Sequence, residues 1–282
     1  MNALTPLGRN QRRQMKTVVM IPARFASTRF PGKPLAMLAV PGGGQKSLIH
    51  LTWEVAMQVR GVAEVHVVTD DERIRGAAEK FGASVLMTSD KCENGTERCA
   101  DAMARYGLDA DLVVNVQGDA PLTPPWFVEE LIGAMADDAA AQVATPVLQC
   151  DPQSYGHFMA DRQAGRVGAT TAVFDARQHA MYFSKEVLPY IDPKKTFSRD
   201  VPVYHHVGVY AYRPPALAAY MAWPMGRLER LEGLEQLRFL ENAHAVRCVV
   251  VDGRGRVFWE VNNPEDVARV EQVLRVLACP VT

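Results

Sequence analysis

Short apolar runs rich in β-branched residues alternate with amphipathic helical patterns through the first half of the chain. A run of this kind is typical of a buried strand, and apolar residues spaced three and four apart are typical of a helix on its surface. The alternation therefore predicts an α/β fold of βαβ units around a largely parallel sheet. The expected strands are residues 17–21, 65–69, 85–87 and 112–116, and the expected helices are residues 47–59, 71–81 and 96–106.

The second half of the chain lacks this simple alternation. Strand-like runs cover residues 142–147, 169–174 and 207–212, and no helical pattern of the βαβ kind joins them, so we expect a mixed sheet. Further expected elements are a helix over residues 228–242, a strand over 248–251 and a helix over 264–276. The glycine-rich residues 41–44 indicate a loop tip and not a domain boundary. We thus expect a flexible tail at 1–16 and a single domain over 17–282.

The composition excludes several classes of protein. The 282 residues include 31 Lys plus Arg and 32 Asp plus Glu, a formal net charge of −1. This balance argues against a general nucleic-acid binder, so any anion site must rest on local charge. No apolar stretch is long enough for a signal peptide or a membrane span. The five cysteines form no CxxC pair, which suits a reducing compartment, and we expect a cytoplasmic protein without a membrane partner.

The loop after the first predicted strand carries three long cations, Arg24, Arg29 and Lys33. A buried strand that leads into so cationic a loop is a poor way to build a core, because unpaired charges near the interior are costly. Hydroxyl and backbone donors lie between the cations, at Ser27 and Gly32 among others, and such groups together can surround a triphosphate. The alternative is an ordinary solvated loop with scattered cations.

The predicted strand at 112–116 leads into Gln117-Gly118-Asp119. Ligands of open parallel sheets collect beyond the carboxyl ends of the strands, so Asp119 and the cationic loop are expected to face one crevice. A carboxylate at this edge can bind a hard cation such as Mg²⁺, and a triphosphate needs both metal and cations as charge builds on its leaving oxygens. The alternative is a turn-forming Asp before Pro121.

The segment Asn94-Gly95-Thr96-Glu97-Arg98 opens a predicted helix. Its Thr96 and Glu97 can serve that helix as cap and dipole partner. In the functional interpretation, Arg98 and the neighbouring backbone lie near a base or a phosphate in the crevice.

Two later motifs are equally open to two interpretations. Residues 206–213 alternate, so His206 and Tyr210 share one strand face with Gly208 and Tyr212. That face suits a hydroxyl-rich or anionic ligand, or it places aromatic side chains in the core. Farther along, Glu235 and Gln236 either bind a substrate or lie on a solvated helical face.

Taken together, these motifs resemble the 3-deoxy-manno-octulosonate (Kdo) cytidylyltransferases, also called CMP-Kdo synthetases. They occur in the order of that family and lie between residues 21 and 270. The matching stretches are IPARFASTRFPGKPL, VVTDDERI, NGTER, NVQGD, MYFSK, HHVGVYAYR, LEGLEQLR and VNNPEDVARV.

The resemblance implies a Rossmann-like nucleotide-diphosphosugar transferase fold with three layers. It implies a homodimer, with acceptor-binding and dimerisation functions in the middle segment, residues 175–245. The implied reaction joins CTP to a 2-keto-3-deoxy sugar acid, whose anomeric hydroxyl attacks the α-phosphorus and releases pyrophosphate.

The resemblance also implies roles for individual residues. Those implied to hold the triphosphate are Arg24, Ser27, Arg29 and Lys33. Those implied near cytidine are Thr96, Arg98 and Gln117. Asp119 is implied to bind Mg²⁺, and with Arg24 and Lys33 it forms the implied catalytic group. Those implied to face the sugar acid are His206, Tyr210, Glu235 and Gln236.

The chain departs from the family pattern in three places. It has Ala120 in place of a glutamate in the QGDEP motif, and Asn262 in place of a second metal-binding aspartate. Asn262 can coordinate through its carbonyl, or Glu260 can take over this role. The family's lysine on the acceptor side is Thr170 or Thr171 here.

These departures leave three hypotheses for the function. The first is a CMP-Kdo-synthetase-like enzyme. The second is a divergent cytidylyltransferase for another acid, such as a modified Kdo or a phosphonate. The third is a catalytically weakened protein that binds CTP.

Overall fold

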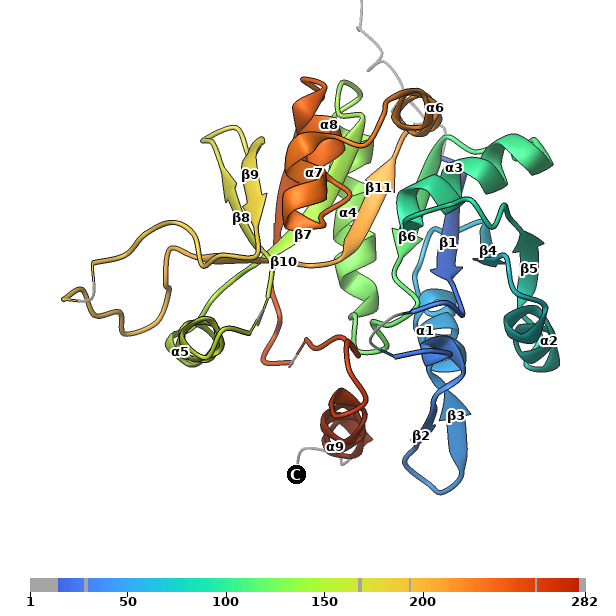
Figure 1. Cartoon of the computed structure of the whole chain (residues 1–282), viewed down its shortest axis with the longest axis horizontal. Helices are drawn as coiled ribbons and strands as arrows, with labels where there is room; N and C mark the ends of the chain where they lie inside the picture. Colours follow the sequence, from blue (N-terminus) through green and yellow to red (C-terminus); the bar gives the residue numbers. More distant parts are fainter. Residues whose placement is uncertain (1–14, 28–29, 167–168, 193, 257, 279–282) are drawn as a thin grey trace, which may run out of the picture.

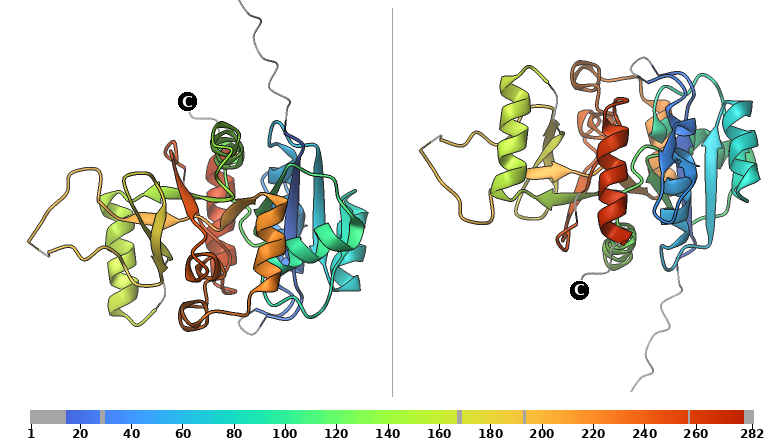
Figure 2. Two further views of the ribbon diagram at one scale, coloured as in Figure 1. Left: turned by 90° about the horizontal axis from the view of Figure 1, so that it is seen from above. Right: turned by 90° about the horizontal axis from the view of Figure 1, so that it is seen from below.

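The computed structural model describes residues 15–278 except 28, 29, 167, 168, 193 and 257. A mixed sheet of ten strands runs through this part of the molecule, in the order β5-β4-β1-β6-β11-β7-β10-β8-β9, and β12 pairs with β7 (Figure 1). Helices cover both of its faces, as the two views of Figure 2 show. The fold therefore has the three layers and the mixed sheet expected from the sequence.

The first four strands of this order are parallel. They are β1 (Thr17–Ala23), β4 (Glu64–Thr69), β5 (Ser84–Met87) and β6 (Leu112–Val116). The helices between them are α1 (Leu48–Met57), α2 (Glu72–Lys80) and α3 (Gly95–Tyr106). Every strand and helix predicted for this half is present, with ends shifted by at most a few residues.

The rest of the sheet mixes the two strand directions. Its strands are β7 (Val143–Gln149), β8 (Thr171–Phe174), β9 (Ala180–Ser184), β10 (Tyr204–His206), β11 (Val209–Tyr212) and β12 (Val246–Val251). Only β12 pairs in parallel here, with β7, and the other pairings are antiparallel. The strand predicted over 207–212 is present as β11, which begins at Val209, and β10 just before it was not predicted.

The two faces of the sheet carry different helices. Alternate residues of β1 explain why: Val19 and Ile21 pack with helices α1, α2 and α4 (Pro125–Asp137), whereas Val18 and Met20 pack with α3, α6 (Pro214–Ala222) and α8 (Leu237–Glu241). A central strand that is apolar on both faces is typical of a sheet covered by two helical layers.

The predicted helix over 228–242 is wrong as a single element. It forms two short helices, α7 (Arg227–Glu232) and α8, because the chain turns at Gly233, where φ is +62°. Only glycine adopts this left-handed conformation without strain. The break places Leu234, Glu235 and Gln236 in a turn.

The remaining elements complete the fold. They are the 3-10 helix η1 (Lys33–Leu35), the hairpin β2 (Met37–Ala39) and β3 (Gln45–Ser47), α5 (Pro152–Gln163) and α9 (Asp266–Ala278). The glycine-rich residues 41–44 lie at the tip of the hairpin, as expected. No helix among the described residues is long and apolar enough to span a bilayer.

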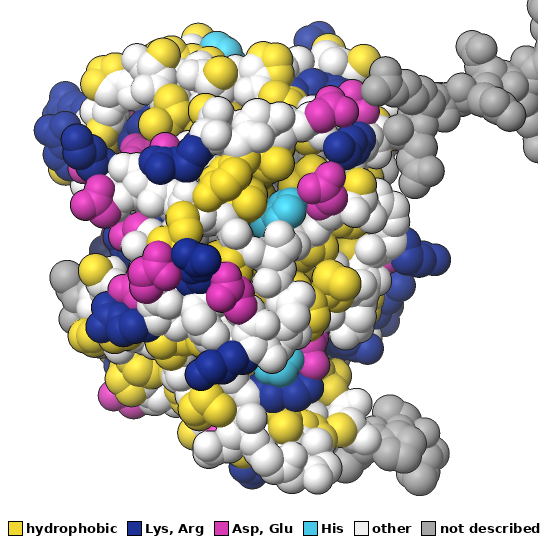
Figure 3. All heavy atoms as spheres, turned by 90° about the vertical axis from the view of Figure 1, so that its right-hand side faces the viewer, with side chains coloured by type: hydrophobic (Ala, Val, Ile, Leu, Met, Phe, Trp, Pro, Cys, Tyr) yellow, Lys and Arg dark blue, Asp and Glu magenta, His cyan; other side chains and the backbone are white. Residues whose placement is uncertain are grey.

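At the β5 end of the sheet, charges of both signs mix on the surface (Figure 3). The pairs on α2 illustrate this, because Arg75 lies 2.9 Å from Glu79 and Arg73 lies 2.6 Å from Asp71. This face presents no stripe of a single sign of the kind that attracts a nucleic acid.

Candidate functional site

A pocket of about 490 Å³ opens at the carboxyl ends of β1 and β6. One wall comes from the loop after β1 and the tip of β6, and the opposite wall comes from α7 and the turn before α8. The start of α3 joins the two walls. The pocket thus lies where ligands of open α/β sheets bind, beyond the ends of the parallel strands.

The loop after β1 brings Arg24, Ser27 and Lys33 to the pocket. Its shape depends on Gly32, whose φ of +70° only glycine readily adopts and whose N–H donates to the carbonyl of Phe25 at 2.9 Å. Arg24 is exposed and donates to the Glu93 carbonyl at 3.3 Å, so its guanidinium keeps most of its donors free. Arg29, also predicted here, lies outside the described residues.

Lys33 and Asp119 face each other across this wall. The Lys33 Nζ lies 2.5 Å from Asp119 Oδ2, and both side chains are largely buried. The main chain of Asp119 continues the contact, because its carbonyl accepts from Val261 N at 2.9 Å. This bond places Glu260 and Asn262 beside Asp119, as the two metal-ligand hypotheses require.

Asp119, Glu260 and Asn262 form a group of oxygen donors. Burial, and then the neighbouring Asp119 charge, raise the pKa of Glu260 to about 7. Gly208 makes room for this carboxylate, because a Cβ at position 208 would lie 2.9 Å from Glu260 Oε1. No cluster of three or more His, Cys, Asp or Glu side chains suited to a metal occurs among the described residues. Two carboxylates and an amide are nevertheless donors that Mg²⁺ accepts when substrate phosphates complete its coordination.

Glu235 lies at the bottom of the pocket, where the two walls meet. Its Oε2 accepts from the Thr96 N–H at 2.8 Å, and its Oε1 accepts from Gln117 Nε2 at 3.0 Å. Burial raises the pKa of Glu235, although the bonds from Thr96 oppose the shift. The carboxylate thus joins the nucleotide-binding candidates Thr96 and Gln117 to the acceptor-binding candidates.

Gln236 lines the pocket and has an unused hydrogen-bond donor. The residue is 1% exposed, and its Oε1 accepts from the Tyr210 hydroxyl at 3.1 Å. Its Nε2 is buried without a hydrogen-bond partner. A buried amide N–H without a partner is costly, so this group is a strong candidate to donate to a ligand.

Two predicted site residues lie behind the pocket and not in its lining. Thr96 is fully buried, and its hydroxyl is 2.7 Å from the Tyr212 hydroxyl, so only its backbone serves the site. His206 is buried against Thr145, with 3.0 Å between its Nε2 and the threonine hydroxyl, and its ring lies 5.4 Å from that of Tyr210. The His206 ring therefore packs behind Tyr210 and does not line the pocket.

Arg98 lines the pocket but is already paired. Its Nη1 donates to the Thr88 hydroxyl at 2.6 Å and lies 3.1 Å from Asp70 Oδ1. Thr171, one of the two residues that can stand in place of the family's lysine, also binds elsewhere, because its hydroxyl donates to the Glu186 carbonyl at 2.7 Å.

Sequence reasoning missed the contribution of α7. Glu229 and Arg230 of α7 line the pocket together with Met225, which precedes this helix, and Arg230 forms no ion pair within the described part of the chain. The signal was Gly233, a typical helix terminator, inside a segment taken as one helix.

The comparisons with known proteins agree with this architecture. The family profile described as cytidylyltransferase matches residues 18–246. The chain belongs to the cytidylyltransferase family. The match includes both walls of the pocket and ends at the start of β12. Cytidylyltransferases transfer a nucleotidyl group, so the chain is a nucleotidyltransferase by family.

Curated relatives cover nearly the whole chain. A 3-deoxy-manno-octulosonate cytidylyltransferase of Maricaulis maris is 44% identical over 260 residues, which are 92% of this chain and 97% of the relative. An 8-amino-3,8-dideoxy-manno-octulosonate cytidylyltransferase of Shewanella oneidensis is 39% identical over 264 residues, which are 93% of this chain and 100% of the relative.

A solved structure extends the likeness to three dimensions. The CMP:2-keto-3-deoxy-manno-octonic acid synthetase complexed with CTP is 35% identical, with a TM-score of 0.76 over 93% of this chain and 99% of the other. The Rossmann-like nucleotide transferase fold expected from the sequence is confirmed.

Proposed function

We propose that this cytidylyltransferase transfers CMP from CTP to a Kdo-like sugar acid and releases pyrophosphate. The observation that carries the proposal is one pocket with two chemically different walls. Arg24 and Lys33, the latter paired with Asp119, line the pocket from the loop after β1. On the opposite side lies the side-chain amide of Gln236, whose Nε2 has no hydrogen-bond partner. The names of the relatives in Maricaulis and Shewanella, and the CTP complex of the related synthetase, point to the same pair of substrates.

The nucleotide-side wall is the loop after β1 with the tip of β6. Arg24, Ser27 and Lys33 would hold the triphosphate there, because cations and hydroxyls are the groups that recognise phosphate oxygens. Lys33 would also balance the charge that develops on the departing pyrophosphate. The Gln117 side chain would lie near cytidine, at the junction with α3.

Mg²⁺ fits the oxygen donors at the end of this wall. Asp119 and Asn262 would hold the ion, with Glu260 beside them. Bound there, Mg²⁺ supplies positive charge to the triphosphate and its leaving group. The Lys33 ammonium already balances the Asp119 charge at 2.5 Å.

The acceptor-side wall consists of α7 and the turn at residues 233–236, backed by β11. Gln236 Nε2 and the side chain of Tyr210 would orient the sugar acid. Arg230 would attract its carboxylate, because no carboxylate among the described residues neutralises this guanidinium. Placing the acceptor hydroxyl next to the α-phosphorus is then the main catalytic task of this wall.

The deciding experiment measures pyrophosphate release from CTP and Mg²⁺ with a panel of acceptors. Kdo, 8-amino-3,8-dideoxy-manno-octulosonate and a phosphonate are each supplied at equal concentration, beside a reaction without acceptor. We expect release with Kdo or its 8-amino derivative. Turnover of the phosphonate alone would replace the proposed acceptor, and CTP binding without release in any reaction would support the weakened-protein hypothesis.

We also propose that the protein works as a homodimer in the cytoplasm. Several large apolar side chains of the middle segment are exposed, namely Met181, Tyr190 and Leu231. A partner chain would cover such exposed apolar surface. Sedimentation at micromolar concentration should give twice the mass of one chain, and a monomer at that concentration would contradict the proposal.

A further inference from the structure

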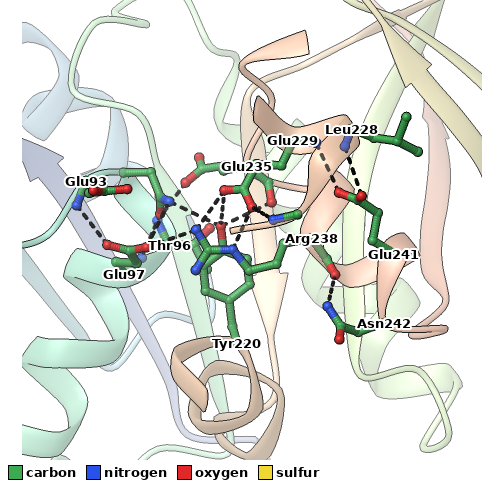
Figure 4. Close-up of polar contacts among 12 residues, drawn as sticks. Glu93, Thr96, Glu97, Tyr220, Leu228, Glu229, Glu235, Arg238, Glu241 and Asn242 are labelled. Atoms are coloured by element: carbon green, nitrogen blue, oxygen red, sulfur yellow. Dashed lines mark hydrogen bonds and ion pairs between the residues drawn. The ribbon is translucent and has the colours of Figure 1, made fainter. Parts of the chain in front are cut away.

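The guanidinium of Arg238 is buried between α3 and α7 (Figure 4). Its side chain is only 4% exposed. Nε and Nη2 donate to the two carboxylate oxygens of Glu229 at 2.7 and 2.8 Å, and Nη2 also lies 3.0 Å from Glu97 Oε1. The guanidinium carbon lies 4.1 Å above the ring of Tyr220. One side chain on α8 therefore contacts α3, α6 and α7.

Arg238 neutralises the carboxylates of Glu97 and Glu229. Among the described residues, Glu97 and Glu229 form ion pairs with no other Lys or Arg. The Glu229 side chain is almost fully buried as well, so loss of the guanidinium would leave an uncompensated charge in the interior. The planar fork of arginine satisfies both oxygens of Glu229 together, which the single ammonium of a lysine does not do.

The same group of residues fixes the turn that faces the acceptor. The Tyr220 hydroxyl donates to the Glu235 carbonyl at 3.1 Å and lies 3.2 Å from Glu229 Oε1. The Tyr220 ring supports the guanidinium from below. Movement of Arg238 would therefore reach Glu235 and Gln236 directly, through Tyr220 and through the main chain of α8.

The nucleotide side has supports of its own. The Asn94 side chain caps α3 by accepting from the Glu97 N–H at 2.9 Å. Arg98 is held by Thr88 and Asp70 at 2.6 and 3.1 Å. These contacts of Asn94 and Arg98 hold the first turn of α3 without using the Arg238 guanidinium.

We propose that Arg238 is a positioning residue for the acceptor. It clamps the turn at 233–236 against α3, so that Gln236 and the junction residue Glu235 face the pocket at a fixed distance from the bound nucleotide. This inference rests on the proposed function, because it assigns the turn to the acceptor acid. Its kinetic signature is a change in the KM for the acceptor without a matching change in CTP affinity.

The test compares Arg238→Lys with Arg213→Lys. Arg213 is a partly buried arginine that donates to the carbonyls of Ala141 and Met135 at 2.9 Å and does not line the pocket. Its variant therefore makes the same arginine-to-lysine substitution outside the proposed site. We expect Arg238→Lys to raise the KM for the acceptor and to lower kcat/KM for it by roughly ten- to hundredfold, because a misplacement near 1 Å costs up to about a hundredfold in rate. The CTP dissociation constant from calorimetry should change by less than about twofold, and Arg213→Lys should change none of these values.

A merely structural role would give a different result. It would reduce the active fraction, and so kcat, while KM for the acceptor stayed at the wild-type value. That result, or an equal loss of affinity for both substrates, would overturn the proposal. Glu229→Gln provides a second variant, because it keeps the shape of the partner but removes its charge, and it should raise the acceptor KM in the same direction.

Hydrogen exchange separates this inference from the proposed function. In Arg238→Lys, amides at 233–236 should exchange faster than in the wild type, and so should the Thr96 amide, which donates to Glu235 Oε2, whereas amides of β1 should not. Unchanged exchange at 233–236 would refute the clamp even if the enzyme is active. If the wild-type protein releases no pyrophosphate with any acid, the proposed function fails, and the exchange result still decides whether Arg238 holds the turn.

Discussion

The nucleotide-side wall leaves Arg24 close to solvent with few partners, whereas the acceptor-side wall buries Arg238 among the carboxylates of α3 and α7. The first arrangement suits a ligand that brings its own charge, since a triphosphate can satisfy free cations on arrival. The second arrangement is complete before any ligand binds. It suits a small acid whose orientation decides whether the hydroxyl reaches the phosphorus. Variants on each wall should therefore affect different kinetic constants.

The largest effect is expected from Asp119→Asn. The change keeps the side-chain volume but removes the charge that pairs with Lys33 and would hold Mg²⁺. Pyrophosphate release should fall by at least about a hundredfold, while the melting temperature stays close to the wild-type value. Asp200→Asn, at an exposed position, is the matched control. Near-normal turnover in Asp119→Asn would remove this residue from the metal site.

A smaller effect is expected from Lys33→Met. Hydrogen bonds to charged groups contribute about 1.5–3 kcal/mol, so CTP should bind roughly ten- to hundredfold more weakly. Lys46→Met is the control, because Lys46 pairs with Glu54 at 2.6 Å, near the hairpin but outside the pocket. Calorimetric titration with CTP measures both variants. The comparison of the walls fails if Lys33→Met changes the KM for the acceptor more than the affinity for CTP.

How well each wall could be predicted follows from how it is built. Arg24 and Asp119 closely follow parallel strands, and Lys33 lies in the loop after the first of them. Such strands bring their carboxyl ends to one edge, so the sequence pattern sufficed to place these residues together. Glu97 and Arg238 meet only through the packing of α3 on α8. Nothing in the sequence around either residue indicates that contact.

Local sequence was also a poor guide within the acceptor-side wall. The apolar spacing over 228–242 fits one helix, but the left-handed conformation at Gly233 turns the chain and creates the pocket-facing segment. His206 is the reverse case, because this polar side chain on a strand face is buried against Thr145 and does not line the pocket. Tertiary packing decided both cases.

The dependence of stability on pH tests the buried part of the acceptor side. Burial, with a smaller effect of His205, lowers the pKa of His206 from 6.5 to about 3. Below pH 6.5 the unfolded chain binds a proton that the folded chain does not, so stability is full above pH 6.5 and falls as the pH drops toward 3. The contribution approaches about 1.4 kcal/mol per pH unit for one proton.

Urea unfolding at pH 7.5 and pH 5.5 measures this loss. His206→Gln should lose less stability between the two values than the wild type, because the titrating group is gone. His157→Gln, at an exposed position, should behave like the wild type. An unchanged loss of stability in His206→Gln would mean that other groups cause the acid sensitivity.

The smallest effect is expected from Arg230→Gln. Arg230 lines the acceptor-side wall from the exposed surface of α7, and exposed charge pairs contribute up to about 1 kcal/mol, so the KM for the acid should rise roughly fivefold while CTP affinity is unchanged. Arg227→Gln is the matched control, because Arg227 is exposed on the same helix but does not line the pocket.

A neutral acceptor sharpens this last test. If Arg230 recognises the carboxylate, the wild type should prefer the sugar acid over its methyl ester. In Arg230→Gln, this preference should fall by about the same factor as the KM for the acid rises. Added salt should reduce the wild-type preference, since it screens an exposed pair. A preference for the acid that survives in Arg230→Gln at full strength would place the carboxylate elsewhere, with the donor of Gln236 as the nearest alternative.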